Sequence, residues 1–242
     1  MKIQNVTFKY PNNDKIILKN INLELIKGKS YALIGPTGEG KSTLAMLMAG
    51  LVQPTEGRIE YKGQDLLRIN KSTLSDSIGF ILQEPFLYEG NILDNIIYGN
   101  KRYMENYIFD PYSSELEFYN KPIDNEPLLN TVLEEIKVRG LEHLLDRFPD
   151  GLSTQVNNSS ENISLGQKQI INFLRVILRD PEFLILDEAT ANLDTITEQI
   201  LQDILAKLPP TTTKVIIAHR LNTIKGVDYK YQVLAGTVEE MK

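Results

Sequence analysis

Apolar and polar residues alternate in two short segments near the start of the chain. These segments, residues 6–8 and 21–25, have the pattern of half-buried strands. Residues 31–34 form a third β-like run, and a glycine-rich turn follows it. Apolar residues then recur at helical spacing over residues 42–50, where Gly50 is suited to the C-terminal cap. The pattern predicts a strand, a glycine loop and a helix in succession.

Two later segments, residues 183–186 and 214–217, are almost continuously apolar. Such runs are typical of strands that are buried on both faces of a parallel sheet. Between about residues 84 and 162 the periodicity is helical instead, most clearly over 128–138 and 141–148. The chain is therefore predicted to have an α/β fold with an inserted helical subdomain.

Within the helical region, residues 101–126 have no regular period and are rich in aromatic residues. Two interpretations stay open, because aromatic residues are enriched both in ordered surface extensions and in partner-docking patches. The aromatic residues are Tyr103, Tyr107, Phe109, Tyr112, Phe118 and Tyr119.

The composition is that of a globular protein, because 42% of the 242 residues are hydrophobic and 24% are charged. It excludes disordered, collagen-like and coiled-coil chains. The apolar runs are far shorter than the roughly 20 residues of a membrane-spanning helix. There is no cysteine, which excludes thiolate metal sites and a cysteine nucleophile. The first residues have no secretory pattern, so a reducing cytosolic location fits best.

The charge of the chain limits its ligands. With 26 basic and 32 acidic residues, the net charge is −6. A negative balance argues against broad electrostatic binding to nucleic acid or to anionic lipid. Any recognition of phosphate must therefore be local.

Residues 35–42 read Gly-Pro-Thr-Gly-Glu-Gly-Lys-Ser and match the phosphate-loop pattern G-x4-G-K-[ST] between a predicted strand and a predicted helix. Glycines let backbone N–H groups point inward around phosphate oxygens, and the helix N-terminus adds a favourable dipole. We expect Lys41 to reach the β- and γ-phosphates, Ser42 to bind Mg²⁺ and Thr43 to contact the α-phosphate. The nucleotide-binding residues predicted here are Gly35, Pro36, Thr37, Gly38, Glu39, Gly40, Lys41, Ser42 and Thr43.

A later predicted strand ends in two carboxylates, Asp187 and Glu188. Ligands of open α/β sheets bind at this end of the strands. We expect Asp187 to hold Mg²⁺ and Glu188 to orient and deprotonate the attacking water. A GTPase would carry Asn-Lys-x-Asp for guanine, and both Asn-Lys pairs of this chain lack the final aspartate. ATP is therefore the expected nucleotide.

With these motifs placed, residues 2–239 resemble the nucleotide-binding domain of an ATP-binding cassette (ABC) transporter. Tyr10, within Phe-Lys-Tyr-Pro, looks like the aromatic residue that stacks on adenine in this family. Gln83 looks like the glutamine that senses Mg²⁺ and connects to the transmembrane partner. Asp194 ends a segment similar to the D-loop, and His219 resembles the switch histidine that contacts the γ-phosphate. The expected catalytic residues are Lys41, Gln83, Glu188 and His219, and the expected metal-binding residues are Ser42, Gln83 and Asp187.

Motifs and patterning together predict a P-loop NTPase core with a mainly parallel sheet, an N-terminal antiparallel β subdomain and an inserted α-helical subdomain. The RecA-like catalytic core is expected over residues 1–83 and 165–242. The helical subdomain is expected over residues 84–164, with an extended segment at 101–126. The local sequences around Gln83 and His219 resemble those of the exporter group, because importers more often carry Thr-His-Asp around the histidine.

The family signature Leu-Ser-Gly-Gly-Gln aligns with residues 163–167, which read Ile-Ser-Leu-Gly-Gln. Ser164, Gly166 and Gln167 are kept, and the resemblance implies that they bind the nucleotide of an opposite subunit. Leu165 replaces the first glycine and is expected to crowd the γ-phosphate. The exporter run Val-Gly-Glu-Arg-Gly is also replaced, by Val-Asn-Asn-Ser-Ser at residues 156–160.

These departures leave two assemblies open. In an asymmetric heterodimer, a partner would supply an intact signature to the site of this chain. The alternative is a homodimer that tolerates Leu165.

The resemblance implies an ATPase that powers an exporter from the cytoplasmic face of a membrane, with ATP and Mg²⁺ as cofactors. Its partners would be a transmembrane domain or subunit and a second nucleotide-binding domain. The alternatives are a soluble single-domain ATPase in cofactor assembly, a nucleotide-gated binding module with little turnover and, least favoured, a kinase. The transported substrate is not encoded here, and the chain is either a free subunit or a domain of a longer polypeptide.

Overall fold

A computed structural model describes residues 1–82, 85–104, 126–157, 159–187, 195–217 and 226–241. The contacts divide the chain into one unit of residues 1–83, 180–192 and 208–242 and another of residues 84–179 and 193–207. The expected α/β fold is confirmed, because a mainly parallel sheet, an antiparallel sheet and a helical region are all present. The expected boundary between residues 164 and 165 stays a prediction, and helix α7 (Leu165–Ile177) belongs by its contacts to the second unit.

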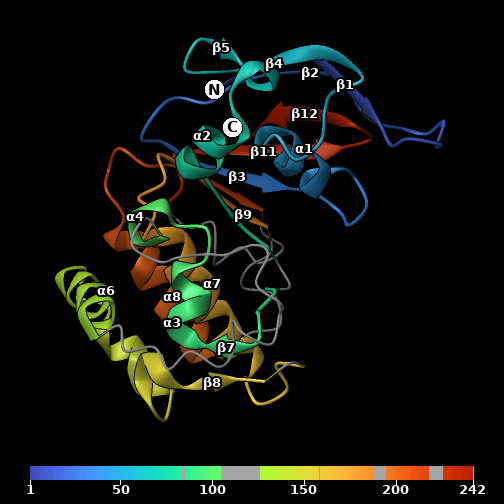
Figure 1. Ribbon diagram of the computed structural model, residues 1–242. Helices are drawn as coiled ribbons and strands as arrows, with labels where there is room; N and C mark the ends of the chain where they lie inside the picture. Colours follow the sequence, from blue (N-terminus) through green and yellow to red (C-terminus); the bar gives the residue numbers. More distant parts are fainter. Residues whose placement is uncertain (83–84, 105–125, 158, 188–194, 218–225, 242) are drawn as a thin grey trace. The chain divides into compact units, whose positions relative to one another are not determined.

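The first unit contains a six-stranded sheet in the order β12-β11-β3-β10-β9-β6 (Figure 1). All neighbours in this sheet are parallel except β12, which forms an antiparallel hairpin with β11. Because β3, β9 and β10 are parallel, the residues that follow them lie at one edge of the sheet. The strands are β3 (Ser30–Ile34), β6 (Ile78–Ile81), β9 (Phe183–Asp187), β10 (Thr213–Ile217), β11 (Tyr229–Leu234) and β12 (Thr237–Glu240).

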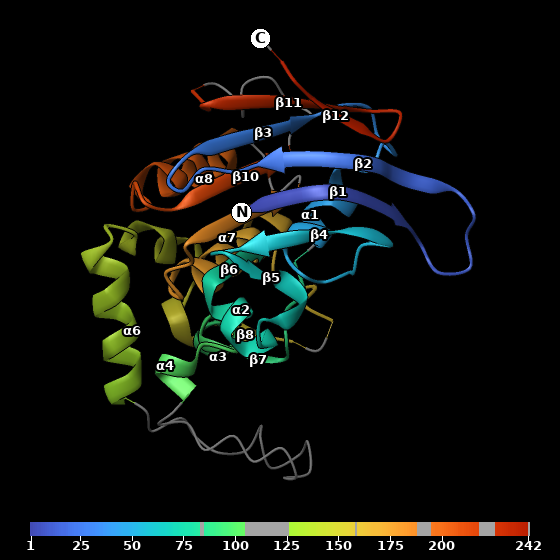
Figure 2. The same cartoon turned by 90° about the horizontal axis from the view of Figure 1, so that it is seen from above.

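A second, antiparallel sheet of the same unit has the order β2-β1-β4-β5 (Figure 2). Ile3 in the central strand pairs with Leu23 on one side and with Ile59 on the other. The buried faces of the two sheets and helix α1 (Lys41–Met48) share one hydrophobic core. The strands are β1 (Lys2–Lys9), β2 (Ile16–Glu24), β4 (Glu56–Tyr61) and β5 (Gln64–Asp65).

Helix α1 ends in a glycine turn that its sequence predicts. Gly50 has φ +69° and lies one residue beyond the cap, Ala49. The N–H of Gly50 donates to the carbonyl of Leu47, and the N–H of Leu51 donates to that of Met46. This pair of bonds is the Schellman motif, which satisfies carbonyls at the helix end and favours glycine. Two short helices, η1 (Leu66–Arg68) and α2 (Lys71–Ser77), follow later in this unit.

The second unit is mainly helical, and α3 packs against α7 (Figure 1). The periodicity over 128–138 is confirmed as part of α6, whereas the segment 141–148 contains only a short 3₁₀ helix, Glu142–Arg147. A proline at position 149 disfavours helical geometry at Phe148, which leaves room only for a short, tight helix. The elements are α3 (Ile92–Ile97), α4 (Lys101–Met104), α6 (Glu126–Val138), η2 (Glu142–Arg147), η3 (Gly151–Ser153), α8 (Thr195–Lys207) and the strand pair β7 (Gly90–Asn91) and β8 (Gln155–Val156).

The predicted extension is described only at its two ends. On its N-terminal side, Tyr103 is buried, and its hydroxyl donates to the carboxylate of Glu135 in α6. Arg102 pairs with the same carboxylate at 2.9 Å. These contacts hold α4 against α6. Residues 105–125 lie outside the described residues, so the two interpretations of the extension stay predictions.

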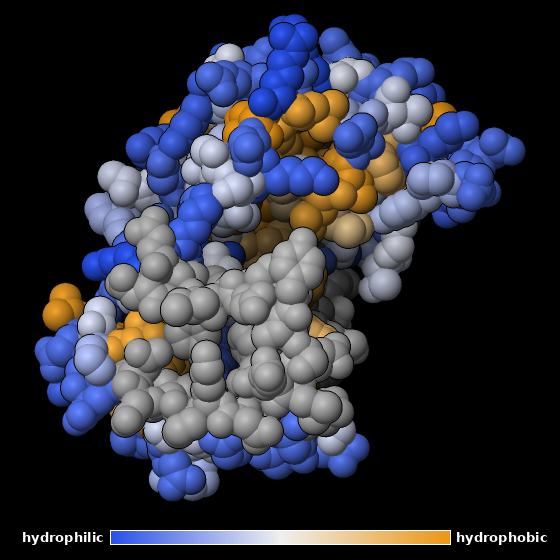
Figure 3. All heavy atoms as spheres, in the orientation of Figure 1, coloured by the Kyte–Doolittle hydropathy of each residue, from blue (hydrophilic) through white to orange (hydrophobic). Residues whose placement is uncertain are grey.

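In the described ranges, no helix combines the length and the apolar character needed to span a membrane. Figure 3 shows hydrophobic side chains gathered in the upper part of the face in view, with hydrophilic ones around them. Large apolar side chains exposed to solvent include Leu51, Phe86 and Val138. Leu51 follows α1, Phe86 precedes β7 and Val138 ends α6, so these three come from separate parts of the chain.

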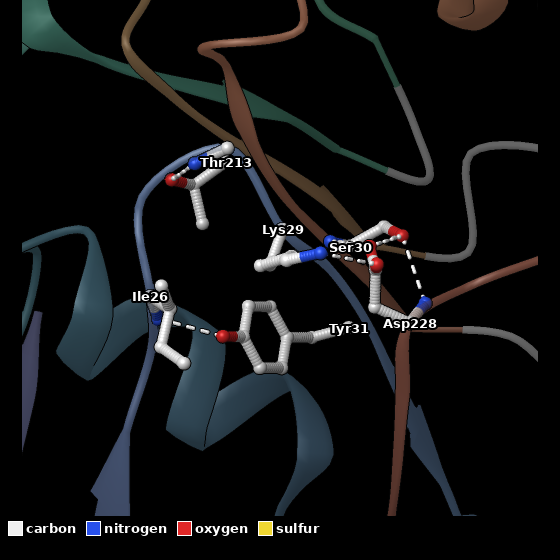
Figure 4. A network of polar contacts seen from close by, with 7 residues as sticks. Ile26, Lys29, Ser30, Tyr31, Thr213 and Asp228 are labelled. Atoms are coloured by element: carbon white, nitrogen blue, oxygen red, sulfur yellow. Dashed lines mark hydrogen bonds and ion pairs between the residues drawn. The ribbon is translucent and has the colours of Figure 1, made fainter.

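A polar network ties together the N-terminal ends of three strands in the parallel sheet (Figure 4). The carboxylate of Asp228 accepts bonds from the N–H and the hydroxyl of Ser30, at 2.8 and 2.7 Å, and from Lys29 at 3.0 Å. Nearby, the N–H of Ile26 donates to the hydroxyl of Tyr31. The N–H of Ser30, helped by its hydroxyl and by Lys29, holds the pKa of Asp228 at about 2, below its usual 3.8.

Replacing Asp228 with asparagine is expected to destabilise the protein at pH 7 by about 1 kcal/mol, because the network is partly exposed. The pKa of Asp228 is lower in the folded state than in the unfolded state, so its contribution is complete above pH 3.8. It is lost as the pH falls through about 2. Urea unfolding from pH 7 to pH 2 should show the two proteins converging; a constant difference would contradict this account.

Candidate nucleotide site

The glycine loop joins β3 to α1, and its backbone adopts conformations that favour glycine. Gly35, Gly38 and Gly40 have φ angles of +155°, +85° and +100°. A Cβ atom on Gly35 would lie 2.1 Å from the carbonyl oxygen of Val233, and one on Gly40 would lie 2.9 Å from Leu18. A Cβ on Gly38 would meet nothing within 4 Å. A Cβ atom is thus excluded at Gly35 by backbone, and at Gly40 it would displace the Leu18 side chain, whereas Gly38 has open space around it.

Lys41, the first residue of α1, points its ammonium group back over this loop. Its side chain is 4% exposed, and Nζ donates to the carbonyls of Gly35 and Pro36 at 2.8 Å each. The positive charge therefore lies beside the first two residues of the loop. An ammonium group in this place, together with free space at the loop glycine, fits a phosphate group.

Ser42 and Asp187 meet at the C-terminal edge of the sheet. The Oγ atom of Ser42 donates to Oδ1 of Asp187 at 3.0 Å, although 145 residues separate them. A hydroxyl and a carboxylate are oxygen ligands of the kind that Mg²⁺ prefers. Among the described residues, no three His, Asp or Glu side chains cluster as a metal site. Mg²⁺ is usually bound through one or two carboxylates and completes its shell with water and substrate phosphates.

Tyr10 directly follows β1, and its side chain contacts helix α1. Its ring packs edge-on against Phe8, with centroids 4.9 Å apart, and its hydroxyl lies 3.1 Å from Oγ1 of Thr43. Beside it opens a hollow of about 620 Å³, lined by residues 8–14, Val52, Gln53 and Thr55. This volume is within the range of small-molecule sites. The structure thus brings Tyr10 and Thr43 together, and their roles toward a nucleotide stay predictions.

The signature segment begins helix α7 in the second unit. Ser164 is the N-cap, and its side chain and that of Gln167 form a capping box. The N–H of Ser164 donates to Oε1 of Gln167 at 2.8 Å, and Nε2 of Gln167 donates to the carbonyl of Arg147 at 2.7 Å. Leu165 and Gly166 are the first two residues of the helix, and Leu165 is 42% exposed. The roles of this segment toward a nucleotide stay predictions.

The loop before the signature is held by asparagine side chains. The N–H of Asn157 donates to Oδ1 of Asn162, and the N–H of Glu161 donates to Oδ1 of Asn157. Asn162 also donates to the carbonyl of Gln155 at 2.7 Å. Asparagine readily forms such local bonds with the backbone. The side chains of Asn157 and Asn162 thus bind backbone groups on both sides of this loop.

Four of the predicted site residues, Gln83, Glu188, Asp194 and His219, lie outside the described residues. Their expected places follow from the sequence alone.

The sequence reasoning did not single out Arg175 on α7. Its guanidinium donates to the carbonyls of Asn95 and Phe86, at 2.7 and 3.0 Å, and to the side chain of Asn95 at 3.1 Å. Burial lowers the pKa of Arg175 to about 10. These bonds connect the helix that begins at the signature to the segment that follows Gln83. A lone basic residue inside an otherwise apolar stretch of helix was the available signal.

The phosphate loop, the Ser42–Asp187 pair and the two sheets are those of an ATP-binding cassette domain. The sequence profile described as "ABC transporter" matches residues 18–191, and the chain belongs to this family. Cassette domains of exporter-type ABC transporters are ATPases, and this chain is such a domain.

Two relatives show the same relationship. The chain is 36% identical over 228 residues to the uncharacterized ABC transporter ATP-binding protein YfiC of Bacillus subtilis, covering 94% of this chain and 34% of the relative. It is 36% identical over 230 residues to the ABC multidrug transporter mdr2 of Aspergillus fumigatus, covering 94% of this chain and 26% of that protein. The chain thus spans about a third or less of the length of these relatives.

A solved structure of an ABC exporter is also similar to this chain. A bacterial Atm1-family ABC exporter with ATP bound superposes with a TM-score of 0.77 at 30% identity, covering 99% of this chain and 38% of the other. The exporter-like resemblance is therefore confirmed.

Proposed function

We propose that this chain binds Mg·ATP and hydrolyses it to drive a membrane exporter. The observation that carries the proposal is the bond between Ser42 in the phosphate loop and Asp187 at the end of β9. It joins the two halves of a site that would hold a phosphate group and its metal ion. Mg²⁺, when bound, would neutralise charge on the phosphates.

Each predicted site residue has a proposed task, and for the described residues their contacts support it. Lys41 and the loop N–H groups would bind the β- and γ-phosphates, and Ser42 and Asp187, with Gln83, would hold the metal. Tyr10 would stack on adenine beside the hollow that it lines. Of the residues outside the described part, Glu188 would orient and deprotonate the attacking water, His219 would contact the γ-phosphate, and Asp194 would bind nucleotide.

The proposed assembly is a sandwich of two nucleotide-binding domains at the cytoplasmic face of a membrane, in contact with a transmembrane domain or subunit. The relatives that are named as transporters, and that are three to four times as long as this chain, support it. The similarity to the solved Atm1-family ABC exporter supports it as well. In this assembly, Ser164, Gly166 and Gln167 would face the nucleotide of the opposite domain. The partner domain is either a second copy or a different chain.

Replacing Leu165 with glycine is expected to raise the phosphate release of the isolated protein, if two copies form the site. The leucine side chain is 42% exposed at the first position of α7, so removing it leaves the core intact and affects stability little. Leu165→Met keeps the bulk and serves as the matched control, for which no gain is expected. Equal rates in all three proteins would contradict the crowding of the γ-phosphate.

The experiment that tests the proposed function is the rate of phosphate release against protein concentration, with Glu188→Gln as the background. A Glu188-dependent rate that rises more steeply than linearly would show that two copies assemble a working site. A background rate with ATP still bound would show that another chain must supply the signature. Failure to bind ATP would contradict the proposal.

A further inference from the structure

The phosphate loop of this chain carries an acidic side chain at its tip, and that side chain is bonded to a distant part of the same unit. The Oε2 atom of Glu39 accepts a hydrogen bond of 2.5 Å from the N–H of Ala235, which is 196 residues away. Ala235 lies at the turn of the β11–β12 hairpin. The pairing of Leu234 with Thr237 leaves only Ala235 and Gly236 in this turn.

The turn has the geometry needed to present that N–H group. Ala235 and Gly236 have φ angles of +49° and +74°. Two left-handed residues between paired strands define a type I′ turn, whose conformation is tightly specified. The carbonyl of Gly236 accepts from the N–H of Lys19 in β2 at 2.8 Å, so the turn is also held from its other side. Figure 2 shows β2 beside this hairpin.

The phosphate loop packs against the same two neighbours. A Cβ atom on Gly35 would lie 2.1 Å from the carbonyl oxygen of Val233 in β11, so the loop begins in direct contact with the hairpin. A Cβ on Gly40 would lie 2.9 Å from the side chain of Leu18 in β2, and a Cβ on Gly236 would lie 2.9 Å from the carbonyl of Ile17. The phosphate loop, the β11–β12 hairpin and β2 therefore each contact the other two. The Glu39–Ala235 bond is the link at the tip of the loop.

A carboxylate in a loop that binds phosphates raises an electrostatic problem. Negative charges repel one another, and a carboxylate that turned toward the ligand would compete with it for the loop N–H groups. The bond to Ala235 directs the Glu39 carboxylate to the hairpin instead. The chain length of glutamate sets whether the carboxylate can make this bond, because aspartate is one carbon shorter.

We propose that Glu39 is a positioning residue that fastens the phosphate loop to the hairpin turn and so holds the loop ready for phosphate. The inference rests on the proposed function, since it concerns the same nucleotide site. It makes the affinity for ATP depend more on the reach of the Glu39 side chain, which sets whether the bond forms, than on its charge. The β11–β12 hairpin becomes, through Ala235, a supporting part of the site.

Two substitutions of Glu39 distinguish the effect of side-chain length on ATP binding from the effect of charge. Glu39→Asp keeps the negative charge and loses the bond, so the Kd for Mg·ATP is expected to rise at least about fivefold. Glu39→Gln keeps an acceptor oxygen of the same reach and removes the repulsion, so the Kd is expected to fall by about two- to threefold. Glu56→Asp, an exposed glutamate of β4 in the same unit, is the matched control and should not change the Kd.

The measurements are isothermal titration with Mg·ATP and amide hydrogen exchange of the nucleotide-free proteins. Exchange at residues 35–41 is expected to be faster in Glu39→Asp than in the wild type, at an unchanged melting temperature. Unaltered affinity and exchange in Glu39→Asp would overturn the inference, as would weaker binding by Glu39→Gln. If the wild type itself binds no Mg·ATP, the proposed function fails; if it binds and Glu39→Asp matches it, only this inference fails.

Discussion

Replacing Lys41 with methionine is expected to weaken ATP binding by at least about tenfold and to lower phosphate release more than about 100-fold. The ammonium group lies over the loop, where it donates to the carbonyls of Gly35 and Pro36. A hydrogen bond to a charged group contributes about 1.5–3 kcal/mol. Since 1.4 kcal/mol is a factor of about ten in an equilibrium constant, the loss of one or two such bonds gives this effect. Methionine retains the apolar stem, which is buried.

The binding isotherm and the initial rate of phosphate release check this result. Lys71→Met is the matched control, because Lys71 is an exposed lysine at the start of α2 in the same unit. Circular dichroism should show that both variants fold. If Lys41→Met bound Mg·ATP as tightly as the wild type, the phosphate loop would not be the nucleotide site.

Replacing Glu188 with glutamine is expected to lower phosphate release about 10²–10⁴-fold, which is the range for loss of a general base. Glu188 directly follows Asp187, the last residue of β9. Glutamine has the same size and can still hydrogen-bond to water, but it cannot take a proton from it. Since Ser42, Lys41 and Asp187 are unchanged, ATP binding is expected to persist, and ATP-bound dimers should accumulate.

Single-turnover phosphate release and sedimentation with and without Mg·ATP measure the two effects. Glu182→Gln serves as the matched control, because this glutamate precedes β9 and pairs with Lys62 on the surface. A Glu188→Gln protein that released phosphate at the wild-type rate would assign the general base to another residue. Loss of ATP binding in the same variant would instead place Glu188 among the residues that bind the nucleotide.

The fold was most predictable where local pattern and burial agree. The apolar runs of β9 and β10 and the strand, loop and helix around the glycine loop all formed as expected. The edge strand β5 and the separate strand pair of β7 and β8 were not predicted, because each of these strands is only two residues long. A strand that short has no readable period, and it forms because a neighbour supplies the hydrogen bonds.

The parts of the site that are contiguous in sequence were predictable, whereas contacts between distant residues were less so. The phosphate loop is a contiguous motif, so its residues and its place before α1 could be read directly. Ser42 and Asp187 were each expected at a metal site because ligands bind at the carboxyl ends of parallel strands, but the direct bond between them was not predicted. The bond from Glu39 to Ala235 could not be predicted, because it depends on the conformation of a hairpin turn 196 residues away.

The central claim, that the phosphate loop of this chain binds Mg·ATP, is tested most directly by one titration of the purified protein with ATP in the presence and absence of Mg²⁺. The account predicts saturable binding at one site per chain, tighter with Mg²⁺ than without it, and markedly weakened in Lys41→Met. Absence of saturable binding, or an isotherm that Lys41→Met and Mg²⁺ removal both leave unchanged, would contradict it.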